Sequence, residues 1–412
     1  MKKKRRKRYR VMISLLLLTI LGISLCFWVI YSGEKDRSSS FAVETGSGNA
    51  ETAHSSEKKT TDFETEQQQE KEADHSKTEE QTETGQNTEA AEQSKEETPE
   101  SFQEKVLVFA GDIYLSPYVT ERYDREGIQG VLSEELLAEM TNADVAVANQ
   151  EFPFSVRGEP AEDKQFTFRI DPSYVKVIKD MGIDVVTIAN NHALDYGIEA
   201  LSDTFDTLDQ GGIAYIGAGG DKERASRPFL VQKGAETFGF LAASRVIPVP
   251  EWNIENRQPG MLCTYDSGAL CESIRQTRQQ CDFLTVYVHW GIERENLPKE
   301  YQRELAKAYI DAGADLVIGA HPHVLQGIEY YNGKPIVYSL GNYIFNQEIA
   351  STMLLKVTVT QENKSVLQLI PAYAAEAKTQ EISQDQRAEW YRFVEEISYG
   401  IQIGEDGIVQ EK

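Results

Sequence analysis

Cysteine is scarce in this chain of 412 residues, and its few positions indicate neither a disulfide framework nor a zinc ribbon. Cys26 lies in an apolar N-terminal run, and Cys263, Cys271 and Cys281 are the other three. An odd number of thiols cannot all pair within one chain, and their spacing matches no zinc-ribbon pattern. A Cys263–Cys271 or a Cys271–Cys281 disulfide is the alternative, but we expect buried or idle thiols and assign them no function.

Basic residues are also few compared with acidic ones. Lys and Arg number 42 against 66 Asp and Glu, which gives a formal net charge of −24. Proteins that bind nucleic acid without sequence preference need a basic surface, so we expect no nucleic-acid partner. An acidic domain with clustered histidines suits a cation better than it suits a bare polyanion.

The basic residues that do occur are concentrated at the N-terminus. Residues 1–10 hold eight Lys or Arg and no acid, and residues 11–31 hold no charge at all. A 21-residue apolar run is long enough to cross a hydrocarbon core of about 30 Å as a helix. The basic block indicates a cytoplasmic tail over 1–10, a transmembrane helix over 11–31 and an extracellular C-terminal domain. A cleaved signal peptide is the alternative, but the run is long and no A-x-A-like cleavage site follows it.

Residues 32–104 lack the large apolar side chains that a core requires. From residue 33 onward this segment holds 20 acidic and 7 basic residues, with abundant Gln, Ser and Thr. Such a segment cannot bury enough surface to offset its ordering entropy, so we predict a disordered acidic linker. It would tether the rest of the chain, which carries a net charge of −19, to the membrane.

From residue 105 the chain alternates between apolar runs of strand length and helical patterns. The predicted strands cover 105–112, 144–151, 184–192, 282–291 and 315–323. The predicted helices cover 134–141, 173–181, 198–210, 267–279 and 299–312. This alternation predicts a parallel sheet covered by helices.

Later segments favour antiparallel pairing. The pairs are 229–232 with 237–243 and, around Asn332-Gly333, 327–331 with 335–340, and further strands cover 352–360 and 365–371. Asn-Gly between two apolar runs is a strong hairpin signal. We therefore predict a mixed α/β domain over 105–375, followed by a C-terminal tail over 376–412 with one helix at 386–396.

Histidine is rare, but four of the six histidines follow apolar runs. Two of them, His321 and His323, flank Pro322 after the run 314–318. In extended backbone, residues i and i+2 point to the same side, so both imidazoles can converge on one point. Two surface histidines on a loop are the alternative interpretation.

Other polar groups also follow the predicted strands. These groups are Gly111-Asp112, Asn149-Gln150-Glu151, Asn190-Asn191-His192, His289-Trp290-Gly291, the His-Pro-His turn and Ser339-Leu340-Gly341-Asn342. Ligands of α/β sheets collect at the carboxyl ends of the strands. Each group alone is weak evidence, because Gly-Asp is a common turn and a lone His is usually a core residue. Together they predict a divalent metal site for Zn, Mn or Fe.

The order and spacing of four of these motifs resemble the CapA family of capsule and poly-γ-glutamate biosynthesis proteins. The motifs are Asn-Asn-His, His-Trp-Gly, His-Pro-His and Ser-Leu-Gly-Asn, and the resemblance covers about residues 105–375. This family is a branch of the calcineurin-like metallophosphoesterases, so the resemblance implies a four-layer α/β/β/α sandwich. Family members are often anchored in the membrane of Gram-positive bacteria, which agrees with the predicted transmembrane helix.

The resemblance also implies roles for single residues. Its implied metal ligands, for one or two ions, are Asp112, Glu151, Asn191, His289, His321 and His323. His192 resembles the residue that stabilises or protonates the leaving group. Asp195 could orient the His192 imidazole as carboxylates near metal sites do, or it could be a helix N-cap. Arg169 could clamp a phosphate or carboxylate, or form a structural salt bridge.

One departure from the superfamily pattern bears on the number of metals. The superfamily begins with Asp-x-His, whereas here Ile113 and Tyr114 follow Asp112, so one expected imidazole is missing. A full two-metal site is therefore in question, although Glu151 could partly compensate.

Three functional hypotheses follow. The first is a metal-dependent phosphoesterase or related hydrolase acting on a phosphorylated or polymeric substrate outside the membrane. The second is a noncatalytic, metal- or polymer-binding component of a membrane complex that makes or exports polyglutamate or another polyanionic surface polymer. The third is a scaffold whose histidines are structural.

Overall fold

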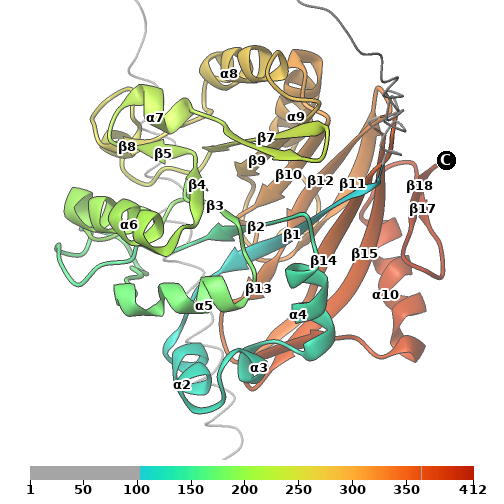
Figure 1. Cartoon of the computed structure of the whole chain (residues 1–412), viewed down its shortest axis with the longest axis horizontal. Coiled ribbons are helices and arrows are strands. Elements are labelled where there is room, and N and C mark those ends of the chain that lie inside the picture. Colours follow the sequence, from blue (N-terminus) through green and yellow to red (C-terminus); the bar gives the residue numbers. More distant parts are fainter. Residues whose placement is uncertain (1–102, 363) are drawn as a thin grey trace, which may run out of the picture. The chain divides into compact units, whose positions relative to one another are not determined.

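The computed structural model describes residues 103–362 and 364–412 (Figure 1). The predicted cytoplasmic tail, the transmembrane helix over 11–31 and nearly all of the linker over 32–104 lie outside the described residues. Among the residues that are described, no helix combines the length and apolar character that crossing a membrane requires.

The first sheet has eight strands and contains the N-terminal strands of the domain. Its order is β16-β15-β14-β1-β2-β3-β4, and β13 pairs with β1 beyond the end of β14. The strands are β1 (Lys105–Ile113), β2 (Val145–Gln150), β3 (Val185–Thr187), β4 (Ala214–Ile216), β13 (Asn342–Ile344), β14 (Ile349–Val359), β15 (Ser365–Ala375) and β16 (Lys378–Glu381). The strands from β1 to β4 are parallel, whereas β14, β15 and β16 pair antiparallel.

The second sheet has six strands in the order β11-β12-β10-β9-β7-β6. Its strands are β6 (Phe229–Lys233), β7 (Glu236–Ser244), β9 (Phe283–His289), β10 (Leu316–Ala320), β11 (Leu325–Tyr331) and β12 (Lys334–Leu340). The four inner strands are parallel, and the edge strands β6 and β11 are antiparallel to their neighbours. The predicted hairpin at Asn332-Gly333 is confirmed, and both residues have the positive φ that its tight turn requires.

The helices agree closely with the predicted positions. They are α2 (Pro117–Glu126), α3 (Ile128–Val131), α4 (Glu134–Thr141), α5 (Val175–Asp180), α6 (Gly197–Gly211), α7 (Lys222–Ser226), α8 (Gly268–Arg278), α9 (Glu300–Ala312) and α10 (Gln384–Glu396). Helices α2, α3 and α7 were not predicted. Helices α3 and α7 are too short to show periodicity, and α2 buries only Val119 and Tyr123, so its apolar pattern is weak. Two small two-stranded antiparallel sheets complete the fold, β5 (Ala218–Gly219) with β8 (Gly260–Met261) and β17 (Ile401–Ile403) with β18 (Val409–Glu411).

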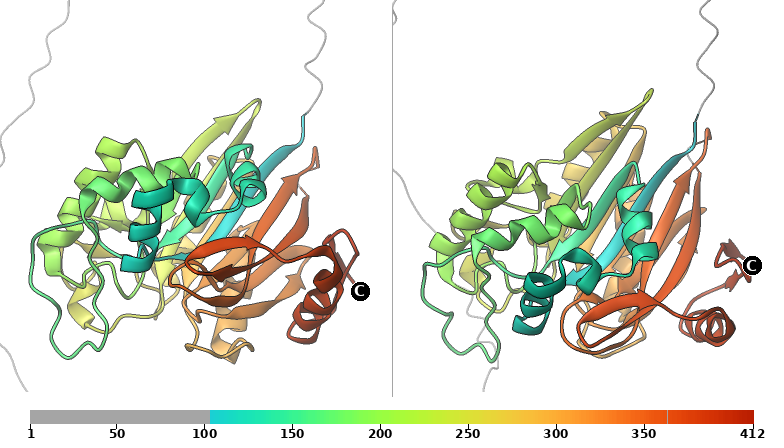
Figure 2. Two further views of the ribbon diagram at one scale, coloured as in Figure 1. Left: turned by 90° about the horizontal axis from the view of Figure 1, so that it is seen from below. Right: turned by 60° about the horizontal axis from the view of Figure 1, so that its bottom comes forward.

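The two large sheets pack face to face, with helices on their outer sides (Figures 1 and 2). Between the sheets, the rings of Phe109 on β1 and Phe240 on β7 lie 6.5 Å apart, and the Tyr287 hydroxyl on β9 donates to the Ala110 carbonyl at 2.8 Å. Alternate residues of β9, such as Leu284 and Val286, face α8 and α9 instead. The prediction of a mixed α/β domain is confirmed.

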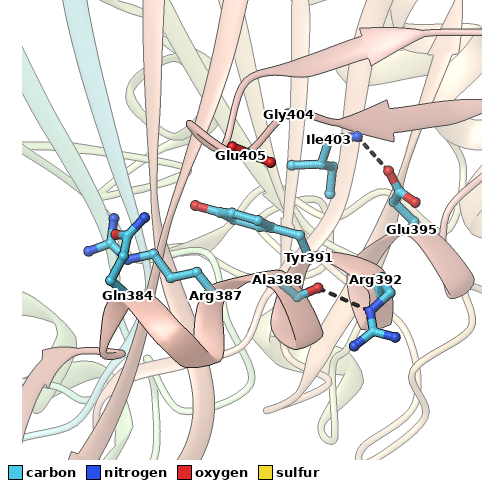
Figure 3. Close-up of a pocket in the computed structure, with 9 residues that line it drawn as sticks. All are labelled: Gln384, Arg387, Ala388, Tyr391, Arg392, Glu395, Ile403, Gly404 and Glu405. Atoms are coloured by element: carbon cyan, nitrogen blue, oxygen red, sulfur yellow. Dashed lines mark hydrogen bonds between the residues drawn. The ribbon is translucent and has the colours of Figure 1, made fainter.

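The segment after residue 375 is part of the same folded unit. Strand β16 extends the first sheet at its edge, and Trp390 on α10 is buried and donates to the Ser351 hydroxyl at 2.8 Å. The Glu395 carboxylate accepts the backbone N–H of Ile403 at 2.6 Å and so ties the β17–β18 hairpin to α10 (Figure 3). A surface pocket lies between the helix and this hairpin, and it is lined by Gln384, Arg387, Ala388, Tyr391, Arg392, Glu395, Ile403, Gly404 and Glu405.

The three cysteines of this unit, Cys263, Cys271 and Cys281, are free and buried, as expected for idle thiols. Burial raises the pKa of all three. Since the thiolate is the reactive form, these thiols are poor nucleophiles and poor metal ligands.

Candidate metal centre

Polar side chains gather where strand ends from the two sheets meet. Asp112 lies near the end of β1, Glu151 directly follows β2, His289 ends β9, and His321 directly follows β10. The two sheets are joined here, because the backbone N–H of His321 donates to Oδ2 of Asp112 at 3.3 Å. Side chains far apart in sequence therefore share one buried region, as the carboxyl ends of α/β strands commonly do.

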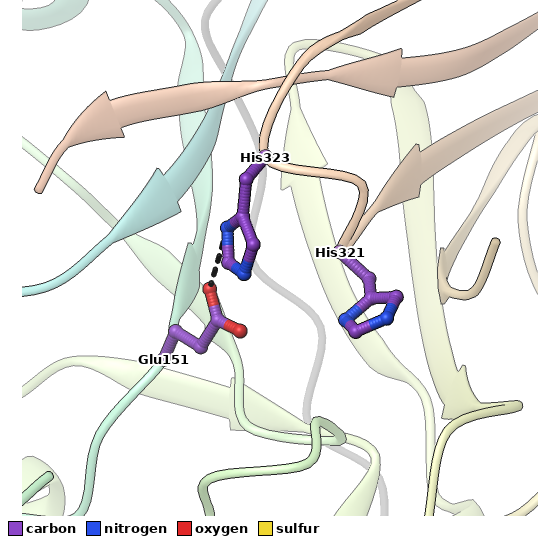
Figure 4. Close-up of side chains that lie close together, drawn as sticks. All are labelled: Glu151, His321 and His323. Carbon is purple, nitrogen blue, oxygen red and sulfur yellow. Dashed lines mark ion pairs between the residues drawn. The ribbon is translucent and has the colours of Figure 1, made fainter. Parts of the chain in front are cut away.

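The centre of this region is formed by Glu151, His321 and His323, whose potential ligand atoms all lie within 4.8 Å of one another (Figure 4). Both carboxylate oxygens of Glu151 and Nδ1 of His321 are buried without a hydrogen-bond partner among the described residues. A buried charge or polar atom without a partner is costly unless something coordinates it. These converging, unpaired donor atoms fit a divalent cation.

The backbone of the His-Pro-His turn differs from the prediction. The expected extended conformation is wrong, since His321 has φ 98° and His323 has φ 58°. The chain must reverse from β10 into β11 within four residues, and positive φ at both histidines makes this reversal possible. The two rings still face the same region, with centroids 5.8 Å apart. Positive φ is costly for residues other than glycine and is found most often at functional sites.

His323 is the one imidazole of the centre held in its charged form. Its Nδ1 lies 3.3 Å from Oδ2 of Asp112, 3.8 Å from Oε2 of Glu151 and 2.8 Å from Oδ1 of Asn342. Burial alone would lower the pKa of His323, but the Glu151 and Asp112 carboxylates raise it to about 10. A divalent cation at this position would compete with that proton.

His289 and His321 are instead held neutral, which is the form that binds metals. Burial lowers the pKa of His289 well below its usual value and that of His321 to about 3. Nε2 of His289 lies 2.7 Å from Oδ1 of Asn191 and 3.6 Å from Oε1 of Glu151. Burial, together with the nearby Asp112, raises the pKa of Glu151 well above its usual value.

Asn149 on β2 contacts two side chains of the centre. Its amide nitrogen donates to Oδ1 of Asp112 at 2.8 Å and lies 3.4 Å from Nδ1 of His289. Asn190 in turn donates to Oδ1 of Asn149 at 3.0 Å and to the Gln150 carbonyl at 2.7 Å. These bonds hold the loop that follows β3. The strand β3 ends at Thr187, whereas the predicted strand extended to residue 192.

His192 lies on that loop, and its orientation is fixed by Asp195. Nδ1 of His192 lies 2.6 Å from Oδ2 of Asp195, which also accepts the Phe168 backbone N–H at 2.7 Å. The N-cap of α6 is Tyr196, so of the two interpretations of Asp195 the structure supports the orienting one. Nε2 of His192 is then turned towards Glu151, at 4.0 Å from Oε1.

Lys164 is a site residue that the sequence did not reveal. Its ammonium pairs with Asp195, donates to the backbone carbonyl of Asn191 and lies 3.0 Å from Nδ1 of His192. Burial lowers the pKa of Lys164, and Asp195 partly offsets that effect. The lysine lies in an irregular loop with neither periodicity nor a motif, so the sequence carried no signal for it.

An aromatic stack covers His192. The Phe168 ring stacks on the His192 ring, with centroids 4.0 Å apart and an interplanar angle of 19°. The Tyr114 ring also stacks on the Phe168 ring, with centroids 3.9 Å apart. Tyr114 stands where the superfamily pattern has the histidine of Asp-x-His. Its ring thus contributes packing at this position in place of an imidazole nitrogen.

Arg169 contacts two backbone carbonyls and an aromatic ring. Its Nη1 donates to the backbone carbonyls of Arg157 at 2.9 Å and Gly158 at 3.1 Å, and the guanidinium lies 4.0 Å from the Tyr196 ring centroid. The alternative of a structural salt bridge is not among the ion pairs of the described residues. Arg169 therefore braces the loop that carries Lys164 and Phe168.

Fold and site together define a mixed α/β protein with a candidate metal centre between two sheets. The model of the family "Bacterial capsule synthesis protein PGA_cap" matches residues 106–347. This range is more than half of the chain, and the chain belongs to that family.

Several characterised or named relatives are similar over most of the folded domain. The PGA biosynthesis protein CapA of Bacillus subtilis is 34% identical over 262 residues, which cover 61% of this chain and 67% of that protein. The capsule biosynthesis protein CapA of Bacillus anthracis is 30% identical over 301 residues, covering 69% and 71%. A probable polyglutamine synthesis accessory protein of Mycobacterium tuberculosis is 31% identical over 288 residues, covering 64% and 76%. The expected membership of the CapA family is confirmed.

Solved structures are similar only at a general level. A putative 5′-nucleotidase from Staphylococcus aureus, in complex with α-ketoglutarate, has 12% identity and a TM-score of 0.43, covering 71% of this chain and 58% of that one. The sulfate thiohydrolase SoxB of Thermus thermophilus has 13% identity and a TM-score of 0.36, covering 57% and 39%. Similarity at this level assigns neither an activity nor a metal.

Proposed function

We propose that this chain is a CapA-like accessory protein of capsule or poly-γ-glutamate synthesis, with a divalent metal centre of the metallophosphoesterase type. One observation carries the metal centre: both buried carboxylate oxygens of Glu151 accept no hydrogen bond from the described residues, and Glu151 converges with His321 and His323. Family membership and the names of the relatives support the biological role.

The residues that would hold the cation are, first, Glu151, His321 and His323, whose ligand atoms converge. Asp112, Asn191 and His289, which the family resemblance adds to this set, contact these residues or one another. When bound, a divalent ion such as Zn, Mn or Fe supplies Lewis-acid polarisation of a phosphoryl or carbonyl oxygen. The packing of Tyr114 against Phe168, in place of an imidazole ligand, favours one ion over two.

His192 would act as a proton donor to the leaving group. Asp195 holds Nδ1, which leaves Nε2 directed to the centre beside Glu151. Burial lowers the pKa of His192, while Asp195 counteracts this by stabilising the protonated ring. The position and the orienting carboxylate are those required of a general acid.

A noncatalytic function is the second candidate. The stacking of Phe168 on the His192 ring supports it, since a covered imidazole can be a packing element. In that case the centre would bind metal or polymer without turnover, as part of a polymer synthesis or export complex.

Replacing His192 distinguishes the two candidates. We expect His192→Gln to lower metal-dependent hydrolysis of a simple phosphodiester by about a hundredfold or more, because a positioned general acid contributes at least that factor. The metal content of the variant, measured by elemental analysis, should stay at the wild-type value. Equal turnover of variant and wild type, or no metal-dependent turnover in either, would favour the noncatalytic function.

We also propose that residues 11–31 anchor the chain in the cell membrane, with residues 1–10 in the cytoplasm and the folded domain outside. Support comes from the uncharged 21-residue run and the basic block before it. The partners of the chain would then be a membrane synthase complex and a polyanionic or phosphorylated substrate outside the cell.

A further inference from the structure

Arg245 directly follows β7, the strand next to that of His289, at the sheet edge that carries the candidate metal ligands. Strand β7 pairs in register with β9, so that Ser244 lies opposite His289. The backbone N–H of Arg245 donates to the His289 carbonyl at 2.7 Å. The arginine therefore begins the loop at the carboxyl end of β7, at the same sheet edge as the candidate metal ligands.

Two tyrosines hold the Arg245 side chain. Its guanidinium carbon lies 3.8 Å from the ring centroid of Tyr265 and 5.0 Å from that of Tyr301. The Tyr301 hydroxyl accepts the backbone N–H of Gly291 at 3.1 Å, which ties this arrangement to the turn that follows His289. Tyr265 is 55% exposed, so the arrangement opens to solvent. Cation–π contacts of this kind hold an arginine in place without using its N–H donors.

The donors of Arg245 are not used elsewhere in the part of the chain that the structure describes. No ion pair and no hydrogen bond found there involves its guanidinium, whereas Arg157, Arg278 and Arg303 each pair with a carboxylate. Arg169 and Arg224 also lack an ion pair among the described residues, but their guanidinium groups donate to backbone carbonyls. A planar guanidinium with free N–H groups is the side chain best suited to bidentate binding of a carboxylate or phosphate.

We propose that Arg245, positioned by Tyr265 and Tyr301, is an oxyanion-binding residue at the rim of the metal centre. It takes a carboxylate or phosphate group of an anionic ligand. That this ligand is the substrate rests on the proposed function; the oxyanion subsite itself stands on the geometry of Arg245.

The test is the binding of two probes, inorganic phosphate and a γ-linked triglutamate, measured by calorimetry on the full chain. Each titration is run with the protein treated with chelator and again with the protein loaded with Zn or Mn. We expect Arg245→Gln to weaken binding of at least one probe by about tenfold or more in both states, because a charge-assisted bidentate contact is lost. Arg245→Lys should recover only part of the affinity, since it keeps the charge without the planar fork.

Arg224→Gln is the matched control. Arg224, on α7, also lies over a tyrosine ring, 4.0 Å from the centroid of Tyr215, which belongs to the edge strand β4 of the other sheet. This control should bind both probes like the wild type, and the thermal unfolding midpoints of all variants should agree.

The outcomes separate this subsite from the metal centre. Loss of phosphate binding alone, or of triglutamate binding alone, supports the proposal and identifies the oxyanion. Wild-type affinity in Arg245→Gln, an equal loss in Arg224→Gln, or no binding of either probe to the wild type would overturn it. A chain that takes up no metal but still binds a probe through Arg245 would refute the metal centre and leave the subsite standing.

Discussion

At the scale of single residues, the site brings together side chains whose surroundings favour the neutral form of some and the charged form of others. Burial disfavours the charged forms of Glu151, His289 and His321, whereas the two carboxylates favour the charged form of His323. Such opposed shifts are typical of functional sites, because a core built for stability alone avoids unpaired buried charge. Lys164 adds a cation to the carboxylate that orients His192.

Replacing Lys164 tests how His192 is controlled. In Lys164→Met the nearby positive charge is gone and Asp195 still contacts His192, so we expect the pKa of His192 to rise by about one unit. The measurement is an NMR titration of histidine labelled with ¹³C. The control is Lys176→Met, because Lys176 lies on α5 and its ammonium lies over the rings of Tyr123 and Tyr174. An unchanged or lower pKa in Lys164→Met would contradict this role.

At the scale of helices and strands, one buried carboxylate joins α9 to the second sheet. Glu329 on β11 accepts two bonds from Arg303 on α9, both at 2.9 Å, and one from the Tyr338 hydroxyl at 2.8 Å. Lys307, also on α9, lies 3.2 Å away. Burial alone would raise the pKa of Glu329, but these three partners lower it to about 2.

Glu329→Gln should therefore lower the free energy of unfolding by about 2 kcal/mol at pH 7, the usual contribution of hydrogen bonds to a charged group. A carboxylate with a lowered pKa in the folded state contributes stability above its ordinary pKa, and this contribution is lost as the pH falls through about 2. The difference between wild type and variant should thus shrink from pH 4.5 downward. Urea unfolding at pH 7 and pH 3 measures it, and a difference that stays constant with pH would refute the account.

Local patterns were sufficient to predict most elements but not the contacts between distant ones. The apolar periodicity of α4 and α9 and the Asn332-Gly333 turn are local signals, and all three features were found. Strand β16 carries no such signal, because its place at the sheet edge depends on pairing with β15. The motifs indicated which strand ends carry polar residues. They could not indicate the positive φ of His321 and His323, or Lys164 reaching in from an irregular loop, since both depend on packing between segments.

At the scale of the whole molecule, we propose that residues 1–104 attach an acidic folded domain to a membrane. We expect the full chain to sediment with membranes and to resist extraction by high salt and by alkaline carbonate, as an inserted helix does. Removal of residues 1–31 should release the folded domain. Fractionation followed by immunodetection measures both, and a full chain that washes off in carbonate would exclude the anchor. Replacing the basic residues of 1–10 alone, the matched control, should leave carbonate resistance intact.

The central claim is the metal centre, and metal content tests it most directly. The purified full chain is incubated with Zn, Mn or Fe, freed of excess ion and examined by elemental analysis beside His321→Ala/His323→Ala. The account predicts about one or two equivalents of a divalent ion in the wild type and its loss in the variant, because two imidazole ligands are removed. A folded wild-type chain that retains none of these ions would contradict it.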